Sequence, residues 1–312
     1  MDCRILQVGP LTERFNRRLA SEHAVVPLWC QGDALAFLDG QGAGFDIVVT
    51  SARFGCSAAM LERLPNVRAI CSFGVGYDAI AVEAARQRGI QVSYTPDVLN
   101  DCVADLAMGL VIDCARRISA ADRFVRAGLW TAGNFPLARK VSGKRLGIVG
   151  LGRIGKDVAR RASGFDMQVR YHNRRPDADA PYGFEADLLA LARWSDFLVL
   201  TCPGGAATHH LISAPVLDAL GPEGILVNVS RGSVVDETAL VAALLEGRLG
   251  GAGLDVFEAE PQVPDALLAL DNLVLAPHIG SGTEETRLQM EELVFANLRA
   301  FTDKGELLTP VV

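Results

Sequence analysis

Three residues in the second half of the chain have side chains that could together reduce a carbonyl group. Arg231, Glu260 and His278 each lie in a short loop that follows an apolar segment typical of a buried strand. In open α/β sheets, ligands bind at the carboxyl ends of the strands, so such loops can share one site. His278 could donate a proton, because imidazole titrates near physiological pH. Glu260 would favour the imidazolium form and hold the ring. Arg231 could bind a substrate carboxylate and polarise the adjacent carbonyl.

Each residue also has a purely structural interpretation. A lone loop histidine is more often a packing or surface residue. Glu260 before Pro261 is typical of a solvated loop end, and Arg231 beside Gly232 could be a structural ion-pair donor. Only their joint placement at strand ends favours the functional interpretation. No cysteine or acidic cluster accompanies the remaining histidines, so we expect no metal site. These histidines are His23, His172, His209 and His210.

A glycine-rich turn in the middle of the chain predicts a dinucleotide site. Residues 150–155 (GLGRIG) stand between a strand pattern, 145–149, and a helix pattern, 156–163, and 168–172 reads as the next strand. In such a βαβ unit the first glycine permits the tight turn, the second lets the backbone approach a pyrophosphate, and the third allows close packing. The helix N-terminus offers N–H groups to the phosphates. The residues expected to contact the cofactor here are Gly150, Gly152, Arg153, Ile154 and Gly155.

The end of the second strand of this unit predicts the type of cofactor. An acidic residue usually stands there and accepts hydrogen bonds from the ribose of NAD, but this chain has Asn173, Arg174 and Arg175. A carboxylate would repel a 2′-phosphate, whereas guanidinium groups can bind it bidentately. We therefore expect NADP(H) to be preferred and NAD(H) to bind more weakly. The alternative is that both arginines lie in a solvated loop before Pro176.

The elements that must position these residues alternate between strand and helix in both halves of the chain. Such alternation predicts an α/β protein with two doubly wound parallel sheets. The predicted strands are 4–8, 25–29, 46–50, 68–72 and 91–94, then 145–149, 168–172, 197–201, 225–229, 251–255 and 273–275. A long apolar helix over 102–127 and an irregular arm over 129–144 separate the two series, and an amphipathic helix over 284–302 follows the second.

Composition restricts the class of protein. The chain has 312 residues, of which 50% are hydrophobic, which suits buried parallel strands. A net charge of −7 argues against a nucleic-acid partner. Seven scattered cysteines without a C-x-x-C motif favour reduced thiols in the cytoplasm. No apolar stretch is long enough to span a membrane, and the N-terminus does not read as a secretory signal.

Five segments together resemble the D-isomer-specific 2-hydroxyacid dehydrogenase family. The resemblance covers nearly the whole chain. Within the family, the chain most resembles the branch of the glyoxylate/hydroxypyruvate reductases and hydroxyphenylpyruvate reductases. Because the motifs occur in a fixed order, the match is highly specific. The segments are 72–80 (SFGVGYDAI), 149–155, 228–236 (NVSRGSVVD), 253–261 (GLDVFEAEP) and 277–283 (PHIGSGT).

This resemblance implies a fold, a reaction and a set of site residues. The implied fold is a Rossmann cofactor domain, 96–283, and a flavodoxin-like substrate domain that joins 1–95 with 284–312. Arg231, Glu260 and His278 match the catalytic residues, and Val75 and Gly76 match the backbone positions that hold the substrate carboxylate. A homodimer built through the long helix and arm of the cofactor domain is also implied. The further cofactor positions are Thr201, Cys202, Pro203, Thr208, Val229, Ser230, Asp255, Gly280 and Ser281.

The leading hypothesis is therefore an NADPH-dependent reductase of a small 2-ketoacid, which leaves glyoxylate, hydroxypyruvate and an aryl pyruvate open as substrates. One alternative is a non-enzymatic NAD(P)-sensing protein on the same scaffold, because a fold does not fix a function. Another is a dehydrogenase of a different small anion, such as formate or phosphite. The complete Arg–Glu–His set favours an enzyme, and the predicted NADPH preference favours a reduction.

Overall fold

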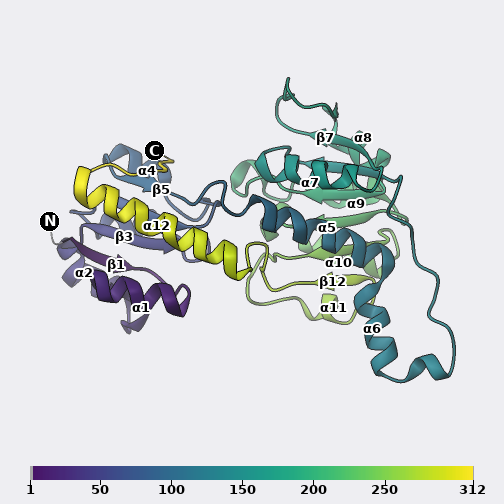
Figure 1. The fold of residues 1–312 in the computed structure, drawn as a ribbon, viewed down its shortest axis with the longest axis horizontal. Coiled ribbons are helices and arrows are strands. Elements are labelled where there is room, and N and C mark those ends of the chain that lie inside the picture. Colours follow the sequence, from purple (N-terminus) through teal and green to yellow (C-terminus); the bar gives the residue numbers. More distant parts are fainter. Residues whose placement is uncertain (1–2, 312) are drawn as a thin grey trace. The chain divides into compact units, whose positions relative to one another are not determined.

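The computed structural model describes residues 3–311, and the chain divides into two compact units. The first unit combines Met1–Leu99 with Glu284–Val312, and the second is Asn100–Thr283. The first break thus lies a few residues beyond residue 95. Each unit is an α/β structure with its own parallel sheet (Figure 1), and the α/β class and the two parallel sheets expected from the sequence are confirmed.

The first unit is built on a five-stranded parallel sheet in the order β2-β1-β3-β4-β5. This is the flavodoxin-like doubly wound order. The inner strands β3 and β4 are buried along their whole length, as expected for apolar segments covered on both faces. The strands are β1 (Arg4–Gln7), β2 (Ala24–Pro27), β3 (Ile47–Ser51), β4 (Ala69–Phe73) and β5 (Gln91–Ser93).

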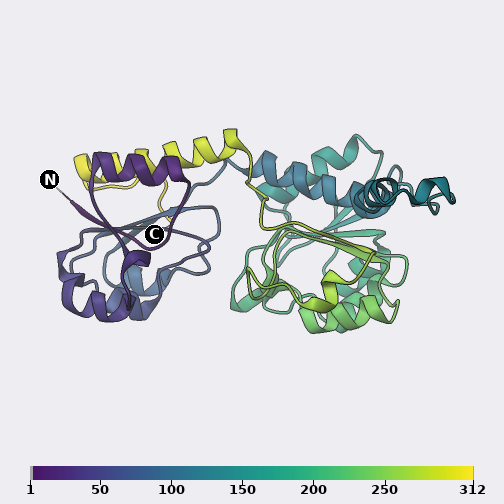
Figure 2. The ribbon, with the colours of Figure 1, turned by 90° about the horizontal axis from the view of Figure 1, so that it is seen from below.

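Helices cover both faces of this sheet (Figure 2), and they are α1 (Glu13–Glu22), α2 (Ala34–Gln41), α3 (Ala58–Glu62), α4 (Val82–Gln87) and α12 (Glu284–Lys304). Helices α1 and α12 lie side by side, and the rings of Phe15 and Phe295 are 4.9 Å apart between centroids. On the other face, Leu38, Leu61 and Ala85 of α2, α3 and α4 join one apolar core. The C-terminal helix therefore completes a core that the N-terminal residues begin.

The second unit contains a seven-stranded parallel sheet in the order β12-β11-β10-β9-β6-β7-β8. The order is that of a Rossmann sheet with one strand added beyond the usual six. Six of these strands were predicted. The strand that was not predicted is the two-residue β8 beside β7, which is too short and too exposed to leave a sequence pattern. The strands are β6 (Arg145–Val149), β7 (Gln168–His172), β8 (Gly183–Phe184), β9 (Phe197–Leu200), β10 (Ile225–Asn228), β11 (Gly251–Leu254) and β12 (Leu273–Leu275).

Two helical layers enclose this sheet, and they contain α5 (Asn100–Arg116), α7 (Arg153–Ser163), α8 (Leu188–Trp194), α9 (Ala214–Leu220) and α10 (Glu237–Leu245). Ala104 of α5 and Val158 of α7 belong to the core on one face. Leu191, Leu217 and Leu240 of α8, α9 and α10 belong to the core on the other. The sheet is therefore buried on both sides, which fixes the strand ends that carry the site.

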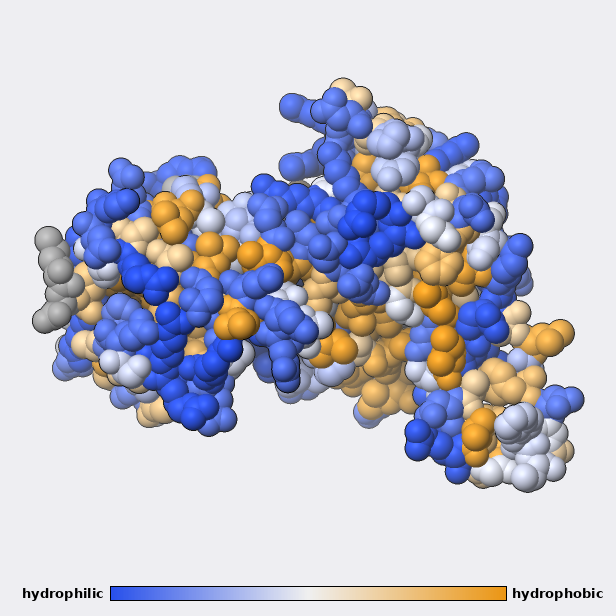
Figure 3. Space-filling model, viewed as in Figure 1, coloured by the Kyte–Doolittle hydropathy of each residue, from blue (hydrophilic) through white to orange (hydrophobic). Residues whose placement is uncertain are grey.

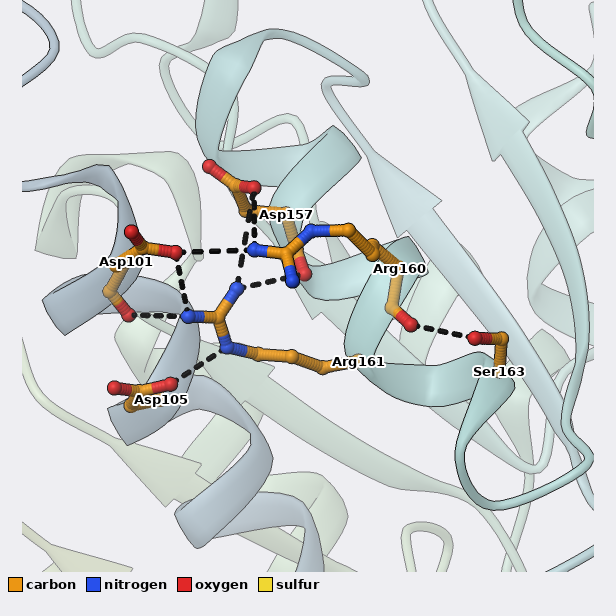
Figure 4. Close-up of polar contacts among 6 residues, drawn as sticks. All are labelled: Asp101, Asp105, Asp157, Arg160, Arg161 and Ser163. Atoms are coloured by element: carbon orange, nitrogen blue, oxygen red, sulfur yellow. Dashed lines mark hydrogen bonds and ion pairs between the residues drawn. The ribbon is translucent and has the colours of Figure 1, made fainter.

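A network of ion pairs holds α5 against the first helix after the glycine turn (Figure 4). Arg161 of α7 binds Asp105 at 2.6 Å and Asp101 at 2.7 Å. Arg160 binds the same Asp101 oxygen and Asp157, each at 3.1 Å. The hydrogen bond from Arg161 holds the pKa of Asp101 below its ordinary value. The network fixes α7, whose N-terminus borders the predicted phosphate site.

The single helix predicted over 102–127 is wrong, because the structure has two helices there. Helix α5 ends at Arg116, and α6 (Ile118–Arg126) begins after Arg117, which adopts a left-handed φ of 54°. The side chain of Asp113 stabilises the break by accepting hydrogen bonds from the backbone N–H of Ser119 at 2.8 Å and from its hydroxyl at 2.5 Å. Within residues 3–311, no helix is both long and apolar enough to cross a bilayer.

Candidate active site

The glycine turn between β6 and α7 has the geometry of a phosphate cradle. Gly150 has a φ of +98°, and a Cβ added there would lie 2.5 Å from the Cys202 nitrogen. A Cβ on Gly155 would lie 2.5 Å from the Gly150 carbonyl oxygen. Packing within the protein therefore requires glycine at both positions. A Cβ on Gly152 would meet nothing within 4 Å, so the open space above this residue fits a bound dinucleotide phosphate.

Asn173, the first residue after β7, braces this turn. Its side-chain oxygen accepts a hydrogen bond from the Leu151 N–H at 2.7 Å. The next two residues, Arg174 and Arg175, are exposed. Within residues 3–311 no hydrogen bond or ion pair engages either guanidinium group, so both are available to a ligand.

The loop that carries these arginines is anchored on its far side. Lys156 of α7 forms an ion pair with Asp177 at 2.6 Å. The Asp177 N–H also donates to the Tyr171 hydroxyl at 2.8 Å. The hydrogen bond from Lys156 lowers the pKa of the Asp177 carboxyl below its usual range. The arginines therefore lie in a loop tied to the strand before it and to the helix of the glycine turn.

Glu260 and His278 meet in the structure. The Nδ1 of His278 lies 2.7 Å from Oε2 of Glu260, and the other oxygen of Glu260 accepts from the Phe257 N–H at 3.1 Å. Burial alone would raise the pKa of Glu260. The hydrogen bond and charge of His278, and the charge of Arg231, outweigh burial and leave this pKa below its ordinary value. Glu260 is therefore a carboxylate that holds the imidazole at Nδ1. This contact leaves the opposite ring nitrogen, Nε2, free to face a substrate.

Asp255 fixes the backbone beside His278. It lies directly after β11 with 1% of its surface exposed. Its two oxygens accept from the N–H groups of Ile279 and Gly280, both at 2.7 Å. Burial raises the pKa of this carboxyl above its ordinary value. His278 itself has a left-handed φ of 55°, and the Asp255 bonds hold the loop in that conformation.

Arg231 lies in a loop that is tightly braced after β10. Asn228 binds both sides of this loop, since its amide donates to the Arg231 carbonyl at 2.9 Å and its side-chain oxygen accepts from the Ser230 N–H at 3.0 Å. A Cβ on Gly232 would lie 1.9 Å from the Phe257 carbonyl carbon. The Arg231 loop is thus pressed against the loop of Glu260, and the structure brings Arg231, Glu260 and His278 together in the second unit.

The residues predicted to line the cofactor lie at the same edge of the second sheet. They follow parallel strands, so they share the carboxyl edge where ligands bind in such sheets. Thr208 is held by its hydroxyl, which donates to the Pro203 carbonyl at 2.7 Å. By strand, they are Thr201, Cys202, Pro203 and Thr208 after β9, Val229 and Ser230 after β10, Asp255 after β11, and Gly280 and Ser281 after β12.

Val75 and Gly76 belong to the first unit, in the loop that follows β4. The preceding Gly74 is fixed by Thr95, whose hydroxyl accepts its N–H at 3.0 Å and whose own N–H donates to the Gly74 carbonyl at 2.9 Å. In the described part of the chain, the N–H groups of Val75 and Gly76 have no hydrogen-bond acceptor. Two adjacent backbone donors in a fixed turn can bind a carboxylate.

Some residues of the site were not predicted. The brace formed by Asn228 could have been found, because a polar amide at the end of an apolar strand is a common loop signal. The contact between Asn173 and the glycine turn could not, since it joins residues 22 positions apart in the sequence. The second histidine–carboxylate contact, between His210 and Glu258, was also missed.

Comparison with known proteins agrees with this geometry. The family profile of the D-isomer specific 2-hydroxyacid dehydrogenase NAD binding domain matches residues 108–280. The chain is 45% identical over 308 residues to a hydroxyphenylpyruvate reductase from Plectranthus scutellarioides, covering 99% of this chain and 98% of that protein. It is 43% identical over 308 residues to a glyoxylate/hydroxypyruvate reductase A from Arabidopsis thaliana, with the same coverage of both.

Solved structures give the same result. The chain superimposes with a TM-score of 0.94 on an NADPH-dependent glyoxylate/hydroxypyruvate reductase from Sinorhizobium meliloti, in complex with NADP and malonate. That structure is 40% identical in sequence, and the match covers 100% of this chain and 97% of the other. The chain therefore belongs to the D-isomer-specific 2-hydroxyacid dehydrogenase family of oxidoreductases, in the branch of the glyoxylate/hydroxypyruvate and hydroxyphenylpyruvate reductases.

Proposed function

We propose that the protein reduces a small 2-ketoacid to the D-2-hydroxyacid with NADPH. The observation that carries this proposal is the 2.7 Å contact between His278 and Glu260, with the charge of Arg231 acting on the same carboxylate. A bound nicotinamide supplies the hydride in such a reaction. The chain must supply a proton and stabilise the negative charge that develops on the carbonyl oxygen. His278 is placed to donate from Nε2, because Nδ1 faces Glu260.

The proposed preference for NADPH rests on Arg174 and Arg175. Both are exposed, and the loop that carries them is anchored by Asn173 and by the Lys156–Asp177 ion pair. A 2′-phosphate would find two guanidinium groups there and no carboxylate in the first two positions after Asn173. The second unit is accordingly proposed to bind the cofactor.

Two groups are proposed to bind the ketoacid. Arg231 has a planar guanidinium that can form paired hydrogen bonds with a carboxylate. In the first unit, the backbone N–H groups of Val75 and Gly76 are proposed as further donors, because the described structure gives them no acceptor. Residues 1–95 with 284–312 are therefore proposed as the substrate domain, and residues 96–283 as the cofactor domain.

We further propose that two copies of the chain form a homodimer through the arm of the second unit. The arm carries apolar side chains at the surface, at the lower right of Figure 3. Helix α6 contributes Ile118 and Val125, and the arm contributes Leu129, Trp130 and Leu137; all five side chains are more than half exposed. Several large apolar side chains exposed in one region favour an association site. A Trp130→Glu variant should shift the protein toward a monomer in light scattering, and an unchanged mass would contradict this interface.

The reaction itself is tested by steady-state kinetics. We expect oxidation of NADPH with glyoxylate, hydroxypyruvate or an aryl pyruvate, and the ratio of the three kcat/KM values identifies the substrate that is preferred. A protein that binds the cofactor but turns over none of these ketoacids would favour the sensing alternative. Activity with formate or phosphite alone would replace the proposed substrate class. A cytoplasmic location is also proposed, from the seven cysteines of the sequence.

A further inference from the structure

A second histidine–carboxylate pair lies beside the proposed active site. The Nε2 of His210 is hydrogen-bonded to Oε1 of Glu258. Their side chains are about one-third exposed, at 37% and 31%. His210 stands in the loop after β9, and Glu258 stands in the loop after β11, two residues before Glu260. Neither residue has a role in the reaction proposed above.

The backbone around this pair joins three loops of the site. The N–H of His210 donates to the carbonyl of Ser233 at 2.8 Å, which ties the β9 loop to the loop of Arg231. The N–H of Glu258 donates to the carboxylate of Glu237 at 3.3 Å, at the start of α10. Contact between Gly232 and Phe257 completes the arrangement, since a Cβ on Gly232 would lie 1.9 Å from the Phe257 carbonyl carbon.

The conformation of His210 restricts its side chain. Its φ of 50° is left-handed, a region that non-glycine residues rarely adopt. Its ring stacks on that of His209, with 3.9 Å between the centroids. The imidazole is therefore held from two sides, by its own backbone and by a neighbouring ring, and it presents Nε2 to Glu258.

We infer that His210 and Glu258 are positioning residues that fix the loop of Glu260 and, through it, the contact between Glu260 and His278. Residues 258–261 form a turn on the surface, and the Phe257 N–H, just before this turn, donates to the Glu260 carboxylate at 3.1 Å. The His210 contact clamps the start of this turn. Without it, the Glu260 carboxylate would sample positions farther from the imidazole.

Charged and titratable groups lie on both sides of this turn. Around the pair lie Glu237 and His209. Around His278 lie Glu260, Asp255 and Arg231. Loss of the clamp should therefore act on the imidazolium of His278 through Glu260. This reasoning rests on the proposed function, in which that imidazolium is the acid.

Three variants of the full chain test the inference through the pH dependence of kcat. In Glu258→Ala the alkaline limb should move to lower pH by a few tenths of a unit. This is less than the roughly one unit expected for Glu260→Gln, which removes the carboxylate itself. In His210→Asn, which keeps a residue tolerant of positive φ, the shift should match that of Glu258→Ala. Glu258→Gln can still accept a hydrogen bond from His210 and should lie close to the parent.

A double variant, Glu258→Ala with Glu260→Gln, separates a positioning effect of Glu258 from a direct effect of its charge. If Glu258 acts through Glu260, Glu258→Ala should add no shift in the Glu260→Gln background. Glu246→Ala is the matched control, since it removes an exposed ion pair of the same unit, to Arg248 at 2.6 Å, and should leave the profile in place. Thermal melting shows that each variant is folded.

Four results would overturn the inference. One is a Glu258→Ala profile that coincides with the parent while Glu260→Gln shifts. A second is a shift caused by Glu258→Ala that is undiminished in the Glu260→Gln background. A third is a Glu258→Gln shift equal to that of Glu258→Ala. Either of these would mean that Glu258 acts by its own charge. If Glu260→Gln itself leaves the profile unchanged, the proposed acid pair fails together with the clamp.

Discussion

Replacement of Arg174 and Arg175 by alanine should remove the preference of the protein for NADPH over NADH. The two guanidinium groups are exposed and lie just beyond Asn173, in a loop anchored by the 2.6 Å ion pair between Lys156 and Asp177. We expect them to bind the 2′-phosphate that distinguishes NADPH from NADH. The double variant should therefore lose kcat/KM with NADPH and keep most of its kcat/KM with NADH.

The size of this loss follows from the type of contact. A hydrogen bond to a charged group contributes about 1.5–3 kcal/mol, and exposed ion pairs contribute less because solvent screens them. A net loss of about 1.4–2.8 kcal/mol for the pair corresponds to about 10- to 100-fold in kcat/KM with NADPH. Because the contact is electrostatic, the parent's preference for NADPH should also decrease as the salt concentration rises.

The assay compares initial rates of ketoacid reduction with the two cofactors at saturating ketoacid. Asn173→Ala is the internal contrast, because Asn173 holds the glycine turn through the Leu151 N–H at 2.7 Å. That variant should weaken both cofactors by similar factors. Equal losses with NADPH and NADH in the double arginine variant would refute the assignment of these arginines to the 2′-phosphate.

Three further predictions concern residues of the candidate active site. In Glu260→Gln, the alkaline limb of the kcat profile should move to lower pH by about one unit, because the variant removes the carboxylate charge that lies 2.7 Å from the imidazole; an upward shift would contradict the pairing. Arg231→Lys should lose about 100-fold in kcat/KM, since lysine lacks the planar fork, and a ketoamide substrate should show a loss that is not additive with it. Full activity of that variant on ketoacids would exclude Arg231 as the carboxylate anchor. Asp255→Asn should cost about 1–3 kcal/mol of unfolding free energy in urea denaturation, because one of the two N–H groups would face an amide donor; an unchanged midpoint at unchanged slope would show that these bonds contribute little.

Local patterns were sufficient to predict the parts of the fold that repeat. Strands β6, β7 and β12 begin and end where they were predicted. For β6 the reason is local, because its largely apolar run is bounded by Lys144 and Gly150. The glycine turn was also predictable, since Gly150 has a φ of +98° and Gly155 lies against the Gly150 carbonyl, both within the turn itself. The predicted proximity of Glu260 and His278 is observed, at 2.7 Å, while their roles in catalysis stay a prediction.

Features that depend on distant contacts could not be predicted in the same way. The helix break at Arg117 results from a side-chain cap by Asp113 in an otherwise helical sequence. Asn173 was predicted only from its lack of charge, whereas the structure uses it to brace Leu151. The tandem His209–His210 has no motif, and its position became clear only when the fold brought Glu258 to it.

The most direct test of the central claim is the reduction of a 2-ketoacid by the parent and by His278→Ala, measured as NADPH consumed, with the handedness of the product determined by chiral separation. We predict that the parent forms the D-2-hydroxyacid. We predict that His278→Ala loses about 100- to 10,000-fold in kcat, the contribution of a general acid, while it binds NADPH as the parent does in a fluorescence titration. A variant that reduces the ketoacid at the parental rate, or a parent that forms the L-product, would contradict the account.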